Sequence, residues 1–265
     1  TFFNQSNDTL RSIVLNDWMH GYSSKRTDLA KRFSDEFYRG FHLAKETERG
    51  NTENLFIYNP DGLLLAWERP EGNSDLVEIS LIDRLLPNQK IILRLSYTVK
   101  IPSDKFTRYG YSDKGGMTLK NWFLTPARYE NHAFVRYNNN NIDDIANASS
   151  DFDINLKISK NLEVTSDLNM NLLLQNETFP IYISGKNRVD FSLFIEPKSS
   201  FYSFKTDAIE VVTNLKENKI SIVQKAIAID RVVDFTNSLI VQYSHEKITV
   251  SETDYQRTPF YGLNQ

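Results

Sequence analysis

Cysteine, long apolar runs and an excess of either charge are all missing from this 265-residue sequence. Without cysteine the chain has no disulfide, no thiolate zinc site and no cysteine nucleophile. Its longest apolar runs are a few residues, such as residues 63–67, whereas a helix across a bilayer needs about 20. The 31 Lys and Arg residues against 34 Asp and Glu residues give a formal net charge of −3. We therefore expect no transmembrane segment and no nucleic-acid partner.

Several catalytic motifs are missing as well. The sequence has no G-x-G-x-x-G, no P-loop and no G-x-S-x-G. A zincin helix needs His-Glu-x-x-His, which places two imidazoles on one helical face, but after His245-Glu246 the second His is replaced by Thr249. That segment favours a turn entering a strand, and His20, His42 and His132 are expected at the surface or partly packed. We predict no catalytic residue and no metal ligand in this chain.

Two groups of aspartates occur in the middle of the chain, and the first could suggest acid–base chemistry. Asp143-Asp144 is a candidate carboxylate pair for a glycosidase, but adjacent side chains tend to point apart and the preceding residues are Asn-rich, which favours a solvated turn. Asp151 and Asp153 alternate with apolar residues and fit the polar face of a strand.

What the sequence does contain is period-two alternation. Residues 91–101 place apolar side chains at every odd position, between turn signals at Pro87-Asn88 and Pro102-Ser103. Similar patterns occur at residues 10–16, 55–58, 63–67, 77–81, 152–158 and 189–195. So many one-sided strands predict a mainly β chain, with an antiparallel β-sandwich or saddle.

Two segments have helical spacing instead. Leu29, Phe33, Phe37 and Phe41 recur every four residues, with Thr27 as a candidate cap and Gly50 as a candidate end, and we assign no role to this helix. Residues 222–240 carry a wide apolar face over about six turns, and strand-like residues 248–250 follow. The architecture is therefore expected to change in the last third of the chain.

Neither end matches the boundary of a complete protein. Residue 1 is Thr, no signal-peptide pattern follows it, and residues 261–265 stop without a stop signal for any element. The sequence is therefore expected to be a fragment, and its location is left open between the cell envelope or periplasm and the cytoplasm.

The order of these segments resembles the amino-terminal part of gluzincin-type zinc aminopeptidases, the family of alanyl aminopeptidase and leukotriene A4 hydrolase. The matching segments are residues 1–16, Leu86-Pro87-Asn88-Gln89 before a strand, residues 151–166, and the long helix followed by residues 243–250. The family's central loop is replaced by residues 125–129 and 138–144, which resembles a divergent, Bacteroidetes-like branch.

The resemblance implies two domains and a substrate-binding edge. Residues 1–178 would form the β-saddle domain, and residues 179–265 the truncated start of an α+β, thermolysin-like catalytic domain. Gly262, Leu263, Asn264 and Gln265 would bind the substrate backbone, with Asn264 where the family has a glutamate that holds the substrate ammonium. Zinc would belong to the full-length parent, whose substrate would be a peptide, with its ligands beyond Gln265.

The fragment alone is expected to bind no zinc and to hydrolyse nothing. In the parent it would wall the substrate cleft and supply the edge strand. Two alternatives stay open: a non-enzymatic β-sandwich binding module, and a pseudo-peptidase, which the amide of Asn264 favours.

Overall fold

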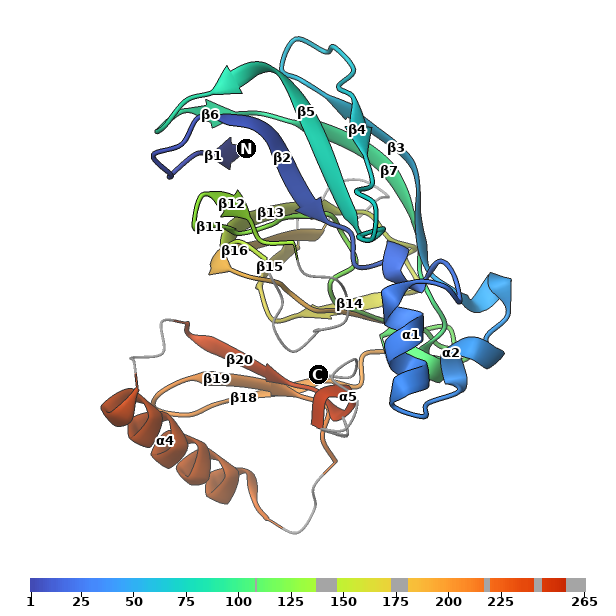
Figure 1. Cartoon of the computed structure of the whole chain (residues 1–265). Helices are drawn as coiled ribbons and strands as arrows, with labels where there is room; N and C mark the ends of the chain where they lie inside the picture. Colours follow the sequence, from blue (N-terminus) through green and yellow to red (C-terminus); the bar gives the residue numbers. More distant parts are fainter. Residues whose placement is uncertain (108, 137–146, 173–180, 217–219, 241–244, 256–265) are drawn as a thin grey trace.

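The computed structural model describes residues 1–107, 109–136, 147–172, 181–216, 220–240 and 245–255. The β-sheets form three successive groups from top to bottom in Figure 1. We call them the upper sheets, the middle sheets and the lower sheet. All strand pairs are antiparallel except β19 with β20, which confirms the prediction of a mainly β, antiparallel chain.

The upper sheets contain the first strands of the chain. Their central pair is β2 with β5, in which Ile13 lies opposite Ile79 and Leu15 opposite Val77. These side chains pack with Ile57 into one core, because alternation places them on the same side of their strands. The predicted strand at residues 91–101 is divided into two. The strands are β1 (Phe2–Phe3) with β6 (Lys90–Ile91); β10 (Thr125–Pro126), β2 (Leu10–Asn16), β5 (Leu76–Leu85) and β4 (Trp67–Glu68); and β3 (Asn51–Tyr58) with β7 (Arg94–Lys100).

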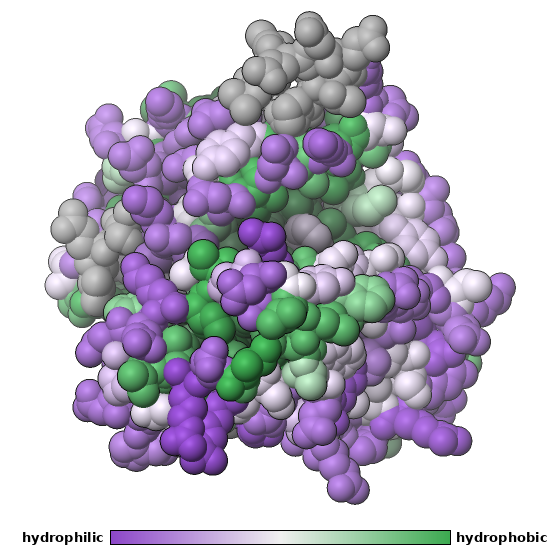
Figure 2. All heavy atoms as spheres, turned by 90° about the horizontal axis from the view of Figure 1, so that it is seen from above, coloured by the Kyte–Doolittle hydropathy of each residue, from purple (hydrophilic) through white to green (hydrophobic). Residues whose placement is uncertain are grey.

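The outer surface of the upper sheets carries exposed apolar side chains. Seen from above, apolar side chains gather in the middle of this face, inside a largely hydrophilic rim (Figure 2). Leu64 and Ile82 are 61% and 62% exposed. Trp67 pairs with Ile79 of β5, and Leu64 forms an isolated antiparallel bridge with Tyr58 of β3.

Short helices flank the upper sheets: α1 (Asp28–Asp35), α2 (Gly40–Leu43) and α3 (Asp104–Thr107), with 3-10 turns at His20–Tyr22 and Glu46–Glu48. Thr27 caps α1 as predicted, since its side chain accepts from Ala30 N. The predicted helix does not continue to Phe41 or end at Gly50. Phe37 has a φ of 59°, a left-handed conformation that ends the helix, and its side chain is 91% exposed.

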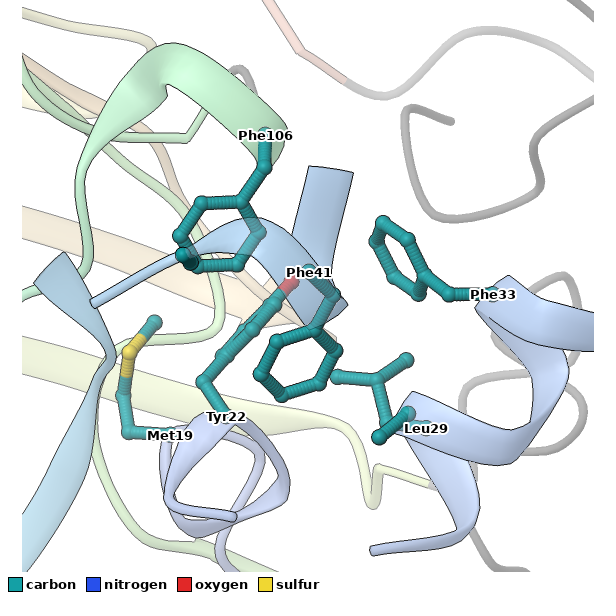
Figure 3. Packing of buried hydrophobic residues seen from close by; sticks show 8 residues of the cluster. Met19, Tyr22, Leu29, Phe33, Phe41 and Phe106 are labelled. Atoms are coloured by element: carbon teal, nitrogen blue, oxygen red, sulfur yellow. The ribbon is translucent and has the colours of Figure 1, made fainter. Parts of the chain in front are cut away.

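The helices have a hydrophobic core of their own, so their role is structural packing beside the sheets. Phe33 and Phe41 are buried edge to face, with ring centroids 5.4 Å apart, and Phe41 stacks on Phe106 of α3 at 5.3 Å (Figure 3). Tyr22 completes the cluster, and burial raises its pKa above the usual range for tyrosine. The helices therefore form a packed unit beside the sheets.

The middle sheets form a second sandwich. Leu193 and Ile195 of one sheet pack with Ile181 and Ile183 of the other, around the buried Leu168. At Gly115, a φ of 83° allows the tight hairpin that the Gly115-Gly116 pair suggests. The strands are β13 (Ser150–Leu156), β16 (Ile181–Arg188) and β15 (Asn169–Leu172); β14 (Glu163–Ser166), β17 (Leu193–Glu196), β9 (Met117–Leu119) and β8 (Gly110–Tyr111); and β11 (Tyr129–Glu130) with β12 (Ala133–Phe134).

Strand pairing in the middle sheets continues beyond residue 178. β16 pairs with β13 and β15, and β17 pairs with β14 and β9. Residues 189–192 are not in a strand, although alternation predicted one there; β16 ends at Arg188 and β17 begins at Leu193. The change from one group of sheets to the next therefore falls between Glu196 and Tyr202.

The lower sheet begins a different architecture, as the sequence predicted. It contains β18 (Tyr202–Lys205), β19 (Glu210–Thr213) and β20 (Lys247–Val250), and the parallel pair β19 and β20 is connected through α4 (Ile222–Leu239). A short helix, α5 (Glu252–Tyr255), follows. Ser221 caps α4 in a capping box with Gln224.

The apolar face predicted for α4 is present but is not covered. None of its residues is buried, and Val232, Phe235 and Leu239 are each more than 60% exposed. Within the described ranges, no helix combines the length and apolar character needed to cross a membrane.

Candidate functional site at the junction of the sheets

Several residues singled out from the sequence cannot be placed. Gly262, Leu263, Asn264 and Gln265 lie outside the described residues, as do Asp143 and Asp144. Asp151 and Asp153 are exposed on β13, as predicted, and both carboxylates accept hydrogen bonds. The donors are the backbone amide of Asn187 at 2.9 Å and the hydroxyl of Tyr182 at 2.5 Å.

The four histidines lie in four different places. His245 precedes β20, in the turn predicted for it. His20 is partly buried, and its Nδ1 lies 2.8 Å from Asn51 Oδ1. Its pKa is lowered, chiefly by burial and then by the nearby charge of Arg69. Across the part of the chain that the structure describes, no group of three His, Asp or Glu side chains is placed to hold a metal ion.

The Ser34–His42 pair resembles part of a hydrolase site. Ser34 Oγ lies 2.6 Å from His42 Nε2, but the same nitrogen also lies 3.0 Å from the carbonyl oxygen of Ala30. A proton donated to that carbonyl leaves Nε2 unable to accept one from serine. This geometry fits a tie between α1 and α2 better than nucleophile activation.

A surface cluster joins Asp8 to the β11–β12 hairpin. The Asp8 carboxylate accepts from the hydroxyl of Tyr129 at 2.9 Å and lies 2.8 Å from His132 Nδ1. These two hydrogen bonds lower the pKa of Asp8, and His132 contributes more than Tyr129. His132 is itself 84% exposed at the side chain.

The strongest candidate is the junction between the middle sheets and the lower sheet. Lys247, the first residue of β20, donates from Nζ to the carbonyl oxygens of Ser166 at 2.8 Å and Leu168 at 2.5 Å. Burial lowers the pKa of Lys247, and the nearby Asp167 charge partly opposes this. One ammonium group therefore links β20 to the end of β14 and to the segment that follows it.

Two carboxylates lie close to this link. Asp167 Oδ1 accepts from Ser192 N at 2.8 Å, and burial raises its pKa. Asp190 lies between β16 and β17, and burial raises its pKa to about 7, with repulsion from Asp167 adding to the shift. Asp190 Oδ2 and Arg188 Nε are buried without a hydrogen-bond partner in the structure.

Clefts open on both sides of the Lys247 link. A cleft of about 640 Å³ lies between β14 and β15 and one face of the lower sheet. Another, of about 580 Å³, lies along β13 and β16 and includes Arg188 and His245. Both volumes fall in the range of ligand sites.

The junction residues are not marked as a site by any sequence motif. Lys247 contacts carbonyls 79 and 81 residues away, and Asp190 is likewise distant in sequence from Asp167. No local motif marks contacts at such separations. An isolated Lys at the start of a predicted strand was the one available signal.

Comparison with known proteins gives similarity to solved structures alone. No protein-family model and no curated protein matches this sequence. An aminopeptidase N family protein from Idiomarina loihiensis is 12% identical with a TM-score of 0.44, covering 93% of this chain and 35% of that one. The M1 zinc metallopeptidase from Deinococcus radiodurans is 12% identical, with a TM-score of 0.46 and coverage of 93% and 49%. A mutant of that metallopeptidase is 13% identical, with a TM-score of 0.49, and the match covers 93% of this chain and 49% of that one. This chain thus spans about a third to a half of the length of those chains.

Proposed function

We propose that this chain is a non-catalytic part of a zinc-dependent aminopeptidase that removes residues from the amino termini of peptides. In this proposal the upper and middle sheets wall the substrate cleft, and Gly262, Leu263, Asn264 and Gln265 form the edge that pairs with the substrate backbone. Zinc belongs to the parent protein, and the described residues take no step of the chemistry.

The observation that carries the proposal is the order of elements. Antiparallel sheets continue to Glu196, and a strand–strand–helix–strand unit with one parallel pair follows. The sequence resemblance to gluzincin aminopeptidases implies the same order, with a long helix and a strand at the entry to the catalytic domain. In this proposal the two domains stay at residues 1–178 and 179–265, and the strand pairing changes somewhat later, between Glu196 and Tyr202.

A peptide substrate agrees with the charge of the chain, because a net charge of −3 offers no general attraction to nucleic acid. The divergent, Bacteroidetes-like branch is part of the proposal and rests on the residues that replace the family's central loop.

The deciding experiment is to read the coding sequence past the codon for Gln265. A His-Glu-x-x-His helix a few dozen residues later, with a further glutamate, is expected. An open frame that continues without that motif would remove the zinc chemistry from the proposal.

A zinc titration of the 265-residue chain gives the first independent prediction. We expect no stoichiometric zinc binding and no release of product from aminoacyl p-nitroanilides, because no described cluster supplies three ligands. Calorimetry with zinc, using the longer parent as the positive control, measures this. Tight binding of one zinc per chain would contradict the division of roles proposed here.

The second candidate, a pseudo-peptidase, is favoured by Asn264. An amide at the position of the family's glutamate gives a substrate ammonium less charge pairing. Asn264→Glu in the parent separates the two: a gain in aminopeptidase rate supports an active enzyme with relaxed specificity, and persistent inactivity supports the pseudo-peptidase.

A further inference from the structure

The cleft of about 640 Å³ beside Lys247 has one wall made of strand edges. β14 pairs with β17 and β15 pairs with β16, and each is the last strand of its sheet within the described part of the chain. Val164 and Thr165 of β14, with Asn169 and Asn171 of β15, line the cleft. A strand at the edge of a sheet has main-chain groups available for another strand.

The opposite wall is one face of the lower sheet. Glu210 and Val212 of β19 point into the cleft together with Ser203 of β18, whereas Val211 and Thr213 face the α4 side. This arrangement follows from the alternation of side chains along a strand. The cleft is therefore a slot between strand edges and a sheet face, and its shape suits an extended chain.

The slot is also lined by charged side chains. Its lining includes Glu210, Glu246 and Lys247. The Lys247 ammonium already donates to the carbonyls of Ser166 and Leu168. Glu210 N bonds to Glu246 O, so β19 and the start of β20 hold both glutamates at the same end of the slot. Lys205 lies opposite Glu210 on β18 but is not part of the lining. The lining itself thus carries two carboxylates and one committed ammonium, which favours a cationic occupant.

We propose that this slot binds an extended peptide segment with a basic side chain, which forms main-chain hydrogen bonds with the β14–β15 wall and places its cation near Glu210 and Glu246. This mode of recognition combines backbone pairing for affinity with side-chain pockets for specificity. The proposal does not depend on peptidase chemistry and concerns residues other than the terminal segment 262–265.

Fluorescence anisotropy with the 265-residue protein tests the proposal. The probes are an acetylated, fluorescein-labelled hexapeptide of alternating Val and Thr with one central Lys, the same peptide with Glu in place of Lys, and a version N-methylated at alternate residues. The protein variants are Ser203→Trp, which fills the slot, and Val232→Trp, a control at an exposed position of α4 outside the slot lining.

The Lys peptide is expected to bind at least tenfold more tightly than the Glu and N-methylated peptides. Ser203→Trp should weaken its binding by at least tenfold, and Val232→Trp should leave it unchanged. Glu210→Gln should reduce the preference for Lys over Glu. Equal binding of the N-methylated and plain peptides, or no binding of the Lys peptide, would overturn the proposal, and the N-methylated probe decides the matter even if Ser203→Trp does not fold.

Discussion

At the scale of single residues, Asn147 connects the upper and middle sheets. It is 2% exposed, and its Oδ1 accepts from Asn16 Nδ2, Trp18 Nε1 and Thr125 Oγ1 at 2.6 to 3.1 Å. Its Nδ2 donates to the carbonyl oxygen of Val189 at 3.1 Å. One amide thus supplies hydrogen bonds for both sheet groups.

We expect Asn147→Ala to lower the free energy of unfolding by about 3 kcal/mol or more, because three buried donors lose their acceptor together. Urea denaturation followed by tryptophan fluorescence measures this. Asn171→Ala, at an exposed position, is the control and should change stability by less than about 0.5 kcal/mol. A small effect of Asn147→Ala would mean that water replaces the amide.

The raised pKa of Asp190 makes the stability of the protein depend on pH. Its folded pKa of about 7 lies above the ordinary aspartate value of 3.8, so between these values the folded state binds a proton that the unfolded state has released. This contribution to stability is therefore complete below about pH 4 and is lost as the pH rises to about 7.

Asp190→Asn should remove that loss, since the amide stays neutral. At pH 8 we expect the melting temperature of the variant to exceed that of the wild type by about 5 °C, and at pH 4 the two should agree. Thermal unfolding monitored by circular dichroism across this range tests the sign. Asp83→Asn, at an exposed position, should show no such trend.

At the scale of elements, the end of α1 has the geometry of a Schellman motif with an unusual residue. Tyr38 N donates to Phe33 O and Phe37 N donates to Ser34 O, while the Tyr38 and Phe33 rings pack at 5.1 Å. The left-handed position is normally glycine, but here it is Phe37, whose exposed ring buries nothing in return.

Phe37→Gly should therefore stabilise the protein by about 0.5–1 kcal/mol, as relief of the left-handed strain outweighs the added freedom of the unfolded chain. Phe37→Ala, which keeps the strain, should give no such gain. The midpoints of urea denaturation compare the three proteins directly. A loss of stability in Phe37→Gly would indicate that the ring makes a contact in solution.

At the scale of the whole molecule, Lys247 joins the lower sheet to the middle sheets. Lys247→Met keeps the length of the side chain but leaves the carbonyls of Ser166 and Leu168 without their donor. We expect a loss of about 2 kcal/mol and a looser junction.

Hydrogen exchange locates this effect. Amides of β14, β15 and β20 should exchange faster in Lys247→Met, whereas those of β2 and β5 should be unchanged. Lys205→Met is the matched control, because Lys205 is exposed on the same sheet. Faster exchange throughout the molecule would contradict a local role for the link.

The sequence alone determined the features that depend on local order. Alternation at residues 10–16 and 77–81 predicted β2 and β5, and the periodicity at residues 222–240 predicted α4, because a strand and a helix repeat their faces over short distances. It also predicted Thr27 as a cap, since capping involves neighbours three residues apart. These expectations needed no knowledge of partners.

Tertiary structure alone decided how those elements meet. Phe37 has the spacing of a buried face yet lies exposed, because a left-handed residue ends the helix before it reaches Phe41. Lys247 and Asp190 both lie near Asp167, although the three residues come from separate segments, and Asn147 bonds to Asn16, 131 residues away. Contacts at such separations leave no local periodicity, so burial and hydrogen bonding in the folded chain were needed to reveal the junction and its clefts.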